Sequence, residues 1–391
     1  MSLDKKIDCL WYFRHRYKKT VHKKEKTEII NEVCTLFNFH RKAAIRHLNK
    51  PVIPPKKNKR GRKAIYNPAI FIPILKQFWF AADQPCGKRL KALIPEWLPF
   101  YEQEYGLIED DVKKKLLSLS SASIDRLLKH TRIQLTHKGR SGTKPGSIIK
   151  QHIPIKVDQW DEKIPGFMEA DTVALCGQSL SGNFVWCLTF TDIATTWTEC
   201  RATWNKGAAG VLEQLKDIEN MLPFPILGFD SDNGSEFLNW HLIHYYQERE
   251  KPVQVTRSRP YKKNDNAHVE QKNWTHIRQL FGYDRFDNEN LVPLMNSLLT
   301  HEYSQLKNHF MPNTKLISKE RVNSKYKKVY DNPKTPYQRL MNSEHIPIDI
   351  KEKLKQQHEQ LNPFHLTQCI ESKLKQIFKL VSVTPSVKKR L

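Results

Sequence analysis

The spacing of apolar residues changes character near residue 158. Before it, apolar positions recur with the 3.6-residue period of helices, as in TEIINEVCTLF and ASIDRLLKH. After it, β-rich runs such as GFMEADTVAL and FVWCLTFTDI are separated by short turn signals such as SLSGN, which favour antiparallel neighbours. From KGAAGVLEQLKDIENML onward, helical and strand patterns alternate. The resulting order, βββαβαβα, predicts an α/β core: a mixed sheet with helices on both faces.

Breaks between these patterns divide the chain into segments. PVIPPKKNKRGRKAIYNP and THKGRSGTKPGSIIKQHIPIKV combine proline, glycine and lysine, and are typical of extended linkers. We therefore expect a helix-turn-helix domain at 1–50, a basic linker at 51–68, a second helical and helix-turn-helix-like domain at 69–135, a linker at 136–157, an α/β core at 158–309, and a basic, mainly helical C-terminal region at 310–391.

The first helical segment ends in a basic helix. In RKAAIRHLNK, Arg41, Lys42 and Arg46 lie opposite an apolar face, and a short break separates this helix from the one before it. A helix, a tight turn and a basic helix form the layout of a helix-turn-helix DNA-binding module. A plain helical hairpin with a solvated basic face explains the same residues equally well.

Two further basic segments precede the core. In SSASIDRLLKHTR, Ser121 is expected to cap a helix that directs Arg126 and Lys129 outward, which makes it a second candidate DNA-binding helix. In the first linker, Arg60 and Arg62 flank a glycine, as in arms that enter the DNA minor groove. A solvated, charged linker is the alternative for these two arginines.

The charge balance narrows the class of partner. The 391 residues include 65 Lys and Arg against 41 Asp and Glu, a formal net charge of +24, which attracts polyanions. Nucleic acid, ribosomal RNA and an anionic membrane surface all fit this charge. No apolar run approaches the roughly 20 residues of a membrane-spanning helix, and no secretory signal is evident. Seven scattered cysteines without a C-x-x-C pair argue against disulfides or a cysteine zinc site. We expect a cytoplasmic, nucleoid-associated protein with no membrane partner.

Three acidic residues stand out by their positions. Asp171 lies inside the apolar strand MEADTVAL, where a charge is costly unless it is paired or binds a cation. Asp232 follows a strand in GFDSDNGSEF, and Glu270 lies on a helix in RPYKKNDNAHVEQKNW, with Asn273 and Trp274 on its face. Taken singly, they are explained by a satisfied core carboxylate, a helix cap and a solvated helix residue. Their combination in this order of elements is the stronger observation.

These motifs resemble those of retroviral integrases and related bacterial insertion-sequence transposases. SDNGSEF is similar to the second acidic motif of that superfamily, RPYKKNDNAHVEQKNW to the third and MEADTVAL to the first. The resemblance covers residues 160–310, and PKTPYQRLM at 333–341 is similar to a segment found after the catalytic domain of the bacterial enzymes. The chain departs from the pattern at Ala267, where many members have glycine.

The resemblance implies a ribonuclease-H-like core with a DDE active site. Asp171, Asp232 and Glu270 would be both catalytic residues and metal ligands, with Asp171 bridging two Mg²⁺ ions and the other two acids holding one each. Mn²⁺ is expected to substitute. Four nearby acids could be mistaken for members of the triad: Glu169, Asp230, Glu236 and Asp265. The motif assigns the role to the aspartate before Asn-Gly, which is Asp232.

Basic residues around the third motif are further candidates. Arg257, Arg259, Lys262 and Lys263 are expected to contact the DNA backbone, and a solvated loop is the alternative. For Trp274, packing in the core is favoured over stacking on a base.

The implied activity is DNA 3′-end cleavage and strand transfer by a DDE transposase. Its partners would be double-stranded DNA, as element ends and as target, and further copies of the chain, at least a dimer on DNA; no small-molecule substrate is expected. Two alternatives stay open: a domesticated DNA-binding regulator that does not cut, and a structure-selective nuclease on the same fold.

Overall fold

A computed structural model describes residues 3–52, 65–133, 162–231, 236–237, 239–257, 272–322 and 325–381. The chain forms two compact units, Met1–Ile65 and Tyr66–Leu391, each described by itself. None of the helices in these ranges is long and apolar enough to cross a membrane.

The first unit is a bundle of three helices. Its core is built from apolar residues spaced at the helical period, among them Phe13, Val33 and Leu48. The second helix ends at Asn38, whose left-handed backbone (φ 53°) turns the chain sharply toward the third. The predicted helical N-terminal region is thus confirmed. The helices are α1 (Leu3–Lys19), α2 (Lys23–Phe37) and α3 (Arg41–Leu48).

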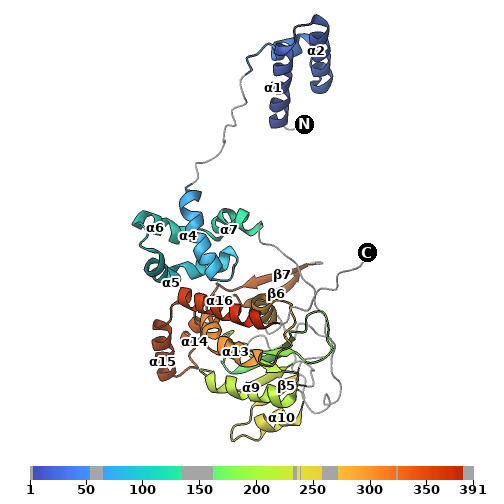
Figure 1. Cartoon of the computed structure of the whole chain (residues 1–391). Coiled ribbons are helices and arrows are strands. Elements are labelled where there is room, and N and C mark those ends of the chain that lie inside the picture. The colour runs from blue at the N-terminus through green and yellow to red at the C-terminus, as the bar shows by residue number, and fades with distance from the viewer. Residues whose placement is uncertain are drawn as a thin grey trace. The chain divides into compact units, whose positions relative to one another are not determined.

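A group of short helices opens the second unit. Trp97 of this group donates its indole N–H to the backbone oxygen of Phe310 and packs against Phe364 at 5.2 Å between ring centroids. The group therefore shares one hydrophobic core with the rest of the unit. Its helices are α4 (Pro68–Ala81), α5 (Gly87–Tyr105), α6 (Asp110–Ser118), α7 (Ser121–Leu127) and α8 (Lys129–Ile133) (Figure 1).

The centre of the second unit is a five-stranded mixed sheet in the order β3-β2-β1-β4-β5. The first three strands are antiparallel, whereas β4 and β5 run parallel to β1. The predicted ribonuclease-H-like core, a mixed sheet between helices, is confirmed. The strands are β1 (Phe167–Ala174), β2 (Val185–Asp192), β3 (Thr198–Trp204), β4 (Gly228–Ser231) and β5 (Gln254–Arg257).

Helices cover both faces of this sheet because successive strand residues point to opposite sides. Ala170 and Leu188 face α9 and α10, whereas Val173 and Cys187 face α13 and η2. These layers can be followed in Figure 1. The covering elements are α9 (Ala208–Met221), α10 (Trp240–Gln247), the π-helical η1 (Asn273–Arg278), α12 (Gln279–Phe281), α13 (Leu291–Leu298), and the π-helical η2 (Leu299–Tyr303) and η3 (Leu306–Phe310).

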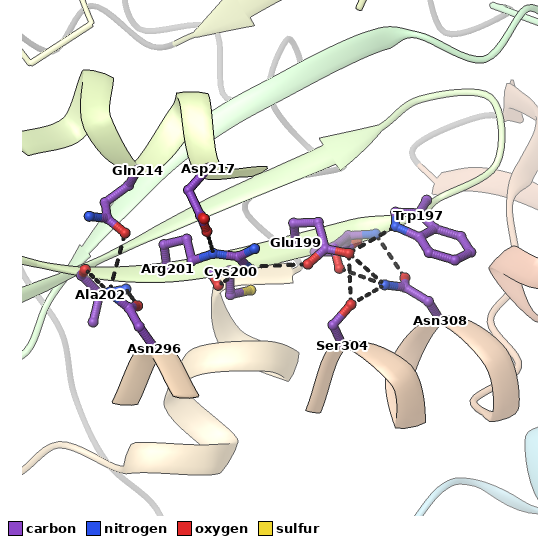
Figure 2. A network of polar contacts seen from close by, with 11 residues as sticks. Trp197, Glu199, Cys200, Arg201, Ala202, Gln214, Asp217, Asn296, Ser304 and Asn308 are labelled. Atoms are coloured by element: carbon purple, nitrogen blue, oxygen red, sulfur yellow. Dashed lines mark hydrogen bonds and ion pairs between the residues drawn. The ribbon is translucent and has the colours of Figure 1, made fainter. Parts of the chain in front are cut away.

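Side-chain amides form hydrogen bonds with the backbone of β3, an edge strand of the sheet. The Asn308 amide accepts from the backbone N–H of Thr198 at 2.9 Å and donates to its oxygen at 3.0 Å. Asn296 does the same for Ala202, at 2.6 and 2.9 Å. Figure 2 shows both amides beside β3. Each asparagine thus supplies the pair of hydrogen bonds that a neighbouring strand would make.

The C-terminal region is mainly helical, as predicted, but contains two strands that the sequence pattern did not indicate. They pair only with each other, in an antiparallel hairpin outside the main sheet (Figure 1). Its elements are β6 (Leu316–Val322), β7 (Lys325–Tyr330), α14 (Pro336–Met341), α15 (Ile348–Glu359) and α16 (Pro363–Leu380).

Candidate active site

Asp171 lies in the middle of β1, the central strand of the sheet. Its side chain is half-buried. Oδ1 accepts from the backbone N–H of Thr172 at 2.7 Å, and Oδ2 accepts from the Asn273 amide at 2.5 Å. Asn273 is the first residue of η1, which packs against β1. The carboxylate is therefore oriented by two donors, one on its own strand and one on the helix that the third motif leads into.

The parallel pairing of β4 with β1 fixes which part of the chain adjoins Asp171. Ser231, the last residue of β4, pairs with Ala170, and Asp230 pairs with Glu169. In the sequence, Asp232 directly follows Ser231. The register thus brings Ser231, the first residue of the second motif, alongside the strand that carries the first motif.

Two of the three predicted metal ligands, Asp232 and Glu270, lie outside the described residues. Within the part of the chain that the structure describes, no three His, Cys, Asp or Glu side chains are grouped closely enough to hold a metal ion. Also outside it are the predicted DNA-contacting residues Arg60, Arg62, Arg259, Lys262 and Lys263, and of Arg257 only the backbone, at the end of β5, is described.

Two more acids share the face of the sheet on which Asp171 lies. Glu169 and Asp230 are both about 95% buried, and Asp230 Oδ1 accepts from the Thr256 hydroxyl at 2.5 Å. Burial places these two carboxylates beneath the surface, whereas Asp171 is partly accessible. Their surroundings suit an internal polar layer better than direct contact with a DNA substrate.

Glu236 belongs to the second motif, and the sequence indicated it only as an acid that could be mistaken for a member of the triad. It is 1% exposed, and its Oε1 accepts from the Thr172 hydroxyl at 2.8 Å and pairs with Lys206 at 2.6 Å. Thr172 directly follows Asp171, on the opposite face of β1. Glu236 therefore anchors the chain just after Asp232 to the strand of Asp171. Its place four residues after Asp232 within SDNGSEF was the available signal.

The start of the η1 helix carries a buried cation. Lys272 is 9% exposed, and its Nζ donates to the backbone oxygen of Thr196 at 3.3 Å. Burial, and after it the positive charge of Arg89, lower the pKa of Lys272 from its usual 10.5 to about 7. Lys272 connects the helix to the β2–β3 turn, and this contact fixes the position of Asn273 beside Asp171.

Trp274 corrects one prediction. Its side chain is 54% exposed, so the expectation of core packing is wrong. Further along the same helix Ile277 and Phe281 are fully buried, whereas Trp274, near its start, is exposed. An exposed aromatic ring thus adjoins the residue that orients Asp171.

The predicted DNA-contacting residues within the described helices are exposed. Arg41, Lys42 and Arg46 all lie on the solvent side of α3. On α7 and α8, Arg126 and Lys129 are likewise exposed. They therefore remain candidates for phosphate contact.

The cap of α7 differs by one residue from the prediction. Ser120, not Ser121, is the N-cap, because Ser120 has the extended backbone conformation and its hydroxyl accepts from the Ser123 N–H at 3.1 Å.

Comparison with curated proteins identifies a relative that matches most of the chain. The chain is 35% identical over 319 residues to y4rM, described as an uncharacterized protein, of Sinorhizobium fredii (strain NBRC 101917 / NGR234); the alignment covers 81% of this chain and 89% of y4rM. The chain therefore belongs to the family of y4rM. No protein-family model matches it.

Solved structures that are similar include two integrases. The HTLV-2 integrase catalytic core domain in complex with magnesium is 13% identical, with a TM-score of 0.28, over 39% of this chain and 92% of that one. The simian T-cell lymphotropic virus intasome in complex with the PP2A regulatory subunit B56 gamma is 12% identical, with a TM-score of 0.32, over 61% of this chain and 71% of that one.

Proposed function

We propose that the chain is a DDE transposase that binds the terminal repeats of a mobile element, cleaves 3′ ends and joins them to target DNA. The observation that carries the proposal is the contact between Asp171 and Asn273. Asn273 lies three residues after Glu270 in the sequence, so a predicted third-motif residue touches the predicted first-motif carboxylate. The register of β1 with β4 gives further support. Ser231 of β4 pairs with Ala170, the residue before Asp171, and Asp232 directly follows Ser231 in the sequence.

The residues fit a divalent metal. Carboxylate oxygens are the hard ligands that Mg²⁺ prefers. Asp171 is partly exposed on β1, and β1 is bordered by β4, whose last residue, Ser231, directly precedes Asp232 in the sequence. We assign Asp171, Asp232 and Glu270 as ligands of two Mg²⁺ ions, with Mn²⁺ as a substitute. Bound there, the ions would activate a water or 3′-hydroxyl and neutralise charge at phosphorus.

The protein's own residues would prepare this site before metal or DNA arrives. Asn273 fixes the orientation of the Asp171 carboxylate through Oδ2. Glu236 and Lys272 fasten the two flanking segments, one to Thr172 and one to Thr196. Positioning of this kind lowers the cost of assembling a ligand set from three separate elements.

DNA recognition is assigned to the basic helices. The three-helix unit presents Arg41, Lys42 and Arg46 on α3, and the second group presents Arg126 and Lys129. Joining two element ends to one target requires at least a dimer on DNA. A cytoplasmic, nucleoid-associated location follows from this role.

The test is nicking and strand transfer on a plasmid that carries the DNA flanking the gene, with Mg²⁺ or Mn²⁺. Glu270→Gln should abolish products while leaving DNA binding intact. Glu248→Gln, which changes an exposed carboxylate at the C-terminal end of α10, is the matched control and should retain activity. Products that persist in Glu270→Gln would refute the assignment. Binding without products, for wild type with either metal, would favour the non-cutting regulator.

A further inference from the structure

The β6–β7 hairpin is a two-stranded ribbon with exposed side chains on both faces. Ile317 and Val322 of β6 are 63% and 52% exposed, and Val329 and Tyr330 of β7 are 41% and 46% exposed. Isolated two-stranded hairpins are marginally stable in water. Such a hairpin is stabilised when its ends are held by the rest of the fold, and it is stabilised further when its surface binds a partner.

The charge of this ribbon is one-sided. Residues 316–330 contain five Lys or Arg and one acidic residue, Glu320. Arg321, Lys327 and Lys328 are exposed, and among the described residues no ion pair engages any of them. Three solvated cations on one ribbon complement a polyanion.

The base of the ribbon is fastened firmly. Asp331, directly after β7, accepts from the backbone N–H of Lys315 at 2.6 Å and pairs with Arg339 of α14 at 2.7 Å. Asn313 and Lys334 exchange two backbone hydrogen bonds at 3.0 Å. The two ends of the hairpin are therefore clamped together and held to α14.

Two residues at the base of the hairpin also contact the β2–β3 turn, which is linked to the helix beside Asp171. Lys315 Nζ donates to the backbone oxygen of Ala194 at 2.8 Å, and the Asn313 amide donates to the Thr196 hydroxyl at 2.8 Å. Thr196 also accepts from Lys272, the residue before Asn273. A chain of direct contacts thus runs from the hairpin base to the helix that orients Asp171, all within one compact unit.

We propose that the β6–β7 hairpin binds the phosphate backbone of double-stranded DNA, without sequence preference, while the DNA is held at the Asp171 site; this rests on the proposed function. Antiparallel ribbons fit the grooves of B-DNA, and lysine contributes point charges suited to phosphates rather than to base reading. The fixed base gives the ribbon a defined position relative to Asp171. It would then set the path of the DNA past the site.

The experiment measures how salt weakens binding of the full-length protein to two duplexes of unrelated sequence. The hairpin variant carries Arg321→Gln, Lys327→Gln and Lys328→Gln. The matched control carries Lys353→Gln, Lys375→Gln and Lys379→Gln, three exposed lysines of α15 and α16. Each lost phosphate contact lowers the slope of log K against log salt by about 0.9, so the hairpin variant should lose about 2 to 3 on both duplexes, and the control much less.

A hairpin variant with the slope of its control would overturn the inference. The charge-preserving variant Arg321→Lys, Lys327→Arg, Lys328→Arg should keep the wild-type slope, and loss of slope there would indicate a folding defect and also count against the inference. Nicking by wild type but not by Asp171→Asn upholds the proposed function whatever the hairpin does. Wild type that fails to bind either duplex at low salt would overturn both.

Discussion

At the scale of single residues, the hydrogen bond from Asn273 to Asp171 predicts that this one amide group matters for activity. Asn273→Ala removes the amide that donates to Oδ2 of Asp171 and so weakens the constraint on the orientation of the carboxylate. Loss of a residue that orients a metal ligand typically costs 10- to 100-fold in activity or metal affinity, so we expect nicking to fall by about that factor while DNA affinity is unchanged. The measurement is the nicking rate against Mg²⁺ concentration, where a positioning role shifts the metal dependence.

Asn290→Ala is the matched control, because Asn290 is exposed at the start of α13 and its side chain makes no cap hydrogen bond. An equal loss in both variants would mean that Asn273 acts only through stability. Full activity of Asn273→Ala would show that Asp171 needs no such support.

At the scale of single residues, the sequence nominated Asp171 as a catalytic candidate but did not indicate the contacts around it. Asp171 was recognised from a charge in an apolar strand, and Asn273 was placed on the face of Glu270 by helical spacing. The roles of Glu236 and Lys272 depend on partners far away in the chain, Thr172 and Thr196, and no local pattern encodes them. Trp274 was assigned to the core because aromatic residues usually are buried, and its actual exposure depends on how the helix is rotated against the sheet.

At the scale of elements, the hydrogen bonds that Asn308 and Asn296 make to the edge of β3 predict a measurable contribution to stability. Asn308→Ala leaves the N–H and carbonyl of Thr198 without their side-chain partners in a buried setting. An unpaired buried backbone group costs about 1 to 3 kcal/mol, so the free energy of unfolding measured in urea should fall by at least that much. Asn296→Ala should behave similarly through Ala202. Aggregation should also rise, because a bare strand edge can pair with another chain.

Asn290→Ala again serves as the reference for losing an exposed amide. If Asn308→Ala unfolds at the same urea concentration as this reference, water replaces the lost partner and the edge does not need its asparagines.

The contact between η3, α14 and α15 predicts acid sensitivity. His309, buried on η3, lies 3.3 Å from His358 of α15 between their Nδ1 atoms and stacks on Tyr337 of α14. Burial lowers the pKa of His309 to about 3, below its usual value of 6.5. The unfolded chain therefore binds a proton that the folded chain does not between about pH 3 and 6.5. The resulting stability is present above pH 6.5 and is lost as pH falls.

For this one group, the free energy of unfolding should be about 2 kcal/mol lower at pH 5 than at pH 8. His309→Phe removes the titration and should reduce the pH dependence by that amount, whereas His345→Gln, at an exposed position, should not. Urea titrations at the two pH values check this. A pH dependence that is the same in wild type and His309→Phe would show that the histidine is already charged in the folded protein.

The sequence largely predicted which segments form helices and which form strands. It did not predict which elements pack against one another. Period-3.6 patterns identified the helices, because most of them bury one face against a core. The five strands of the sheet were identified as β-rich runs between turn signals, and helices cover both of their faces. The β6–β7 strands were missed because their side chains are mostly charged or exposed, so no apolar alternation marks them.

For the molecule as a whole, the boundary at Ile65 and Tyr66 determines which truncations are informative. Residues 66–391 should fold with an unchanged Tm when the first 65 are deleted, because no part of their core lies in the deleted unit. Specific binding to element ends should weaken strongly, while metal-dependent nicking of non-specific DNA should persist. Calorimetry and binding to end and non-end duplexes measure these outcomes.

Removal of residues 1–135 is the contrasting truncation. It takes away Trp97 and its neighbours, which share a core with Phe310 and Phe364, so it should abolish cooperative unfolding altogether. The sequence suggested that 69–135 is a separate domain, a division that stays a prediction. A soluble, cooperatively folding 136–391 fragment would show that the shared core is dispensable.

The separate core of the three-helix unit has a consequence for how such a protein can change. Phe13, Val33 and Leu48 belong to a hydrophobic core whose described members all lie in the first unit, so another small domain could replace that unit without repacking the sheet or disturbing Asp171. Under the proposed function, the DNA sequence that is recognised and the reaction that is performed would then be inherited as independent parts, and a new specificity would require replacement of residues 1–65 alone.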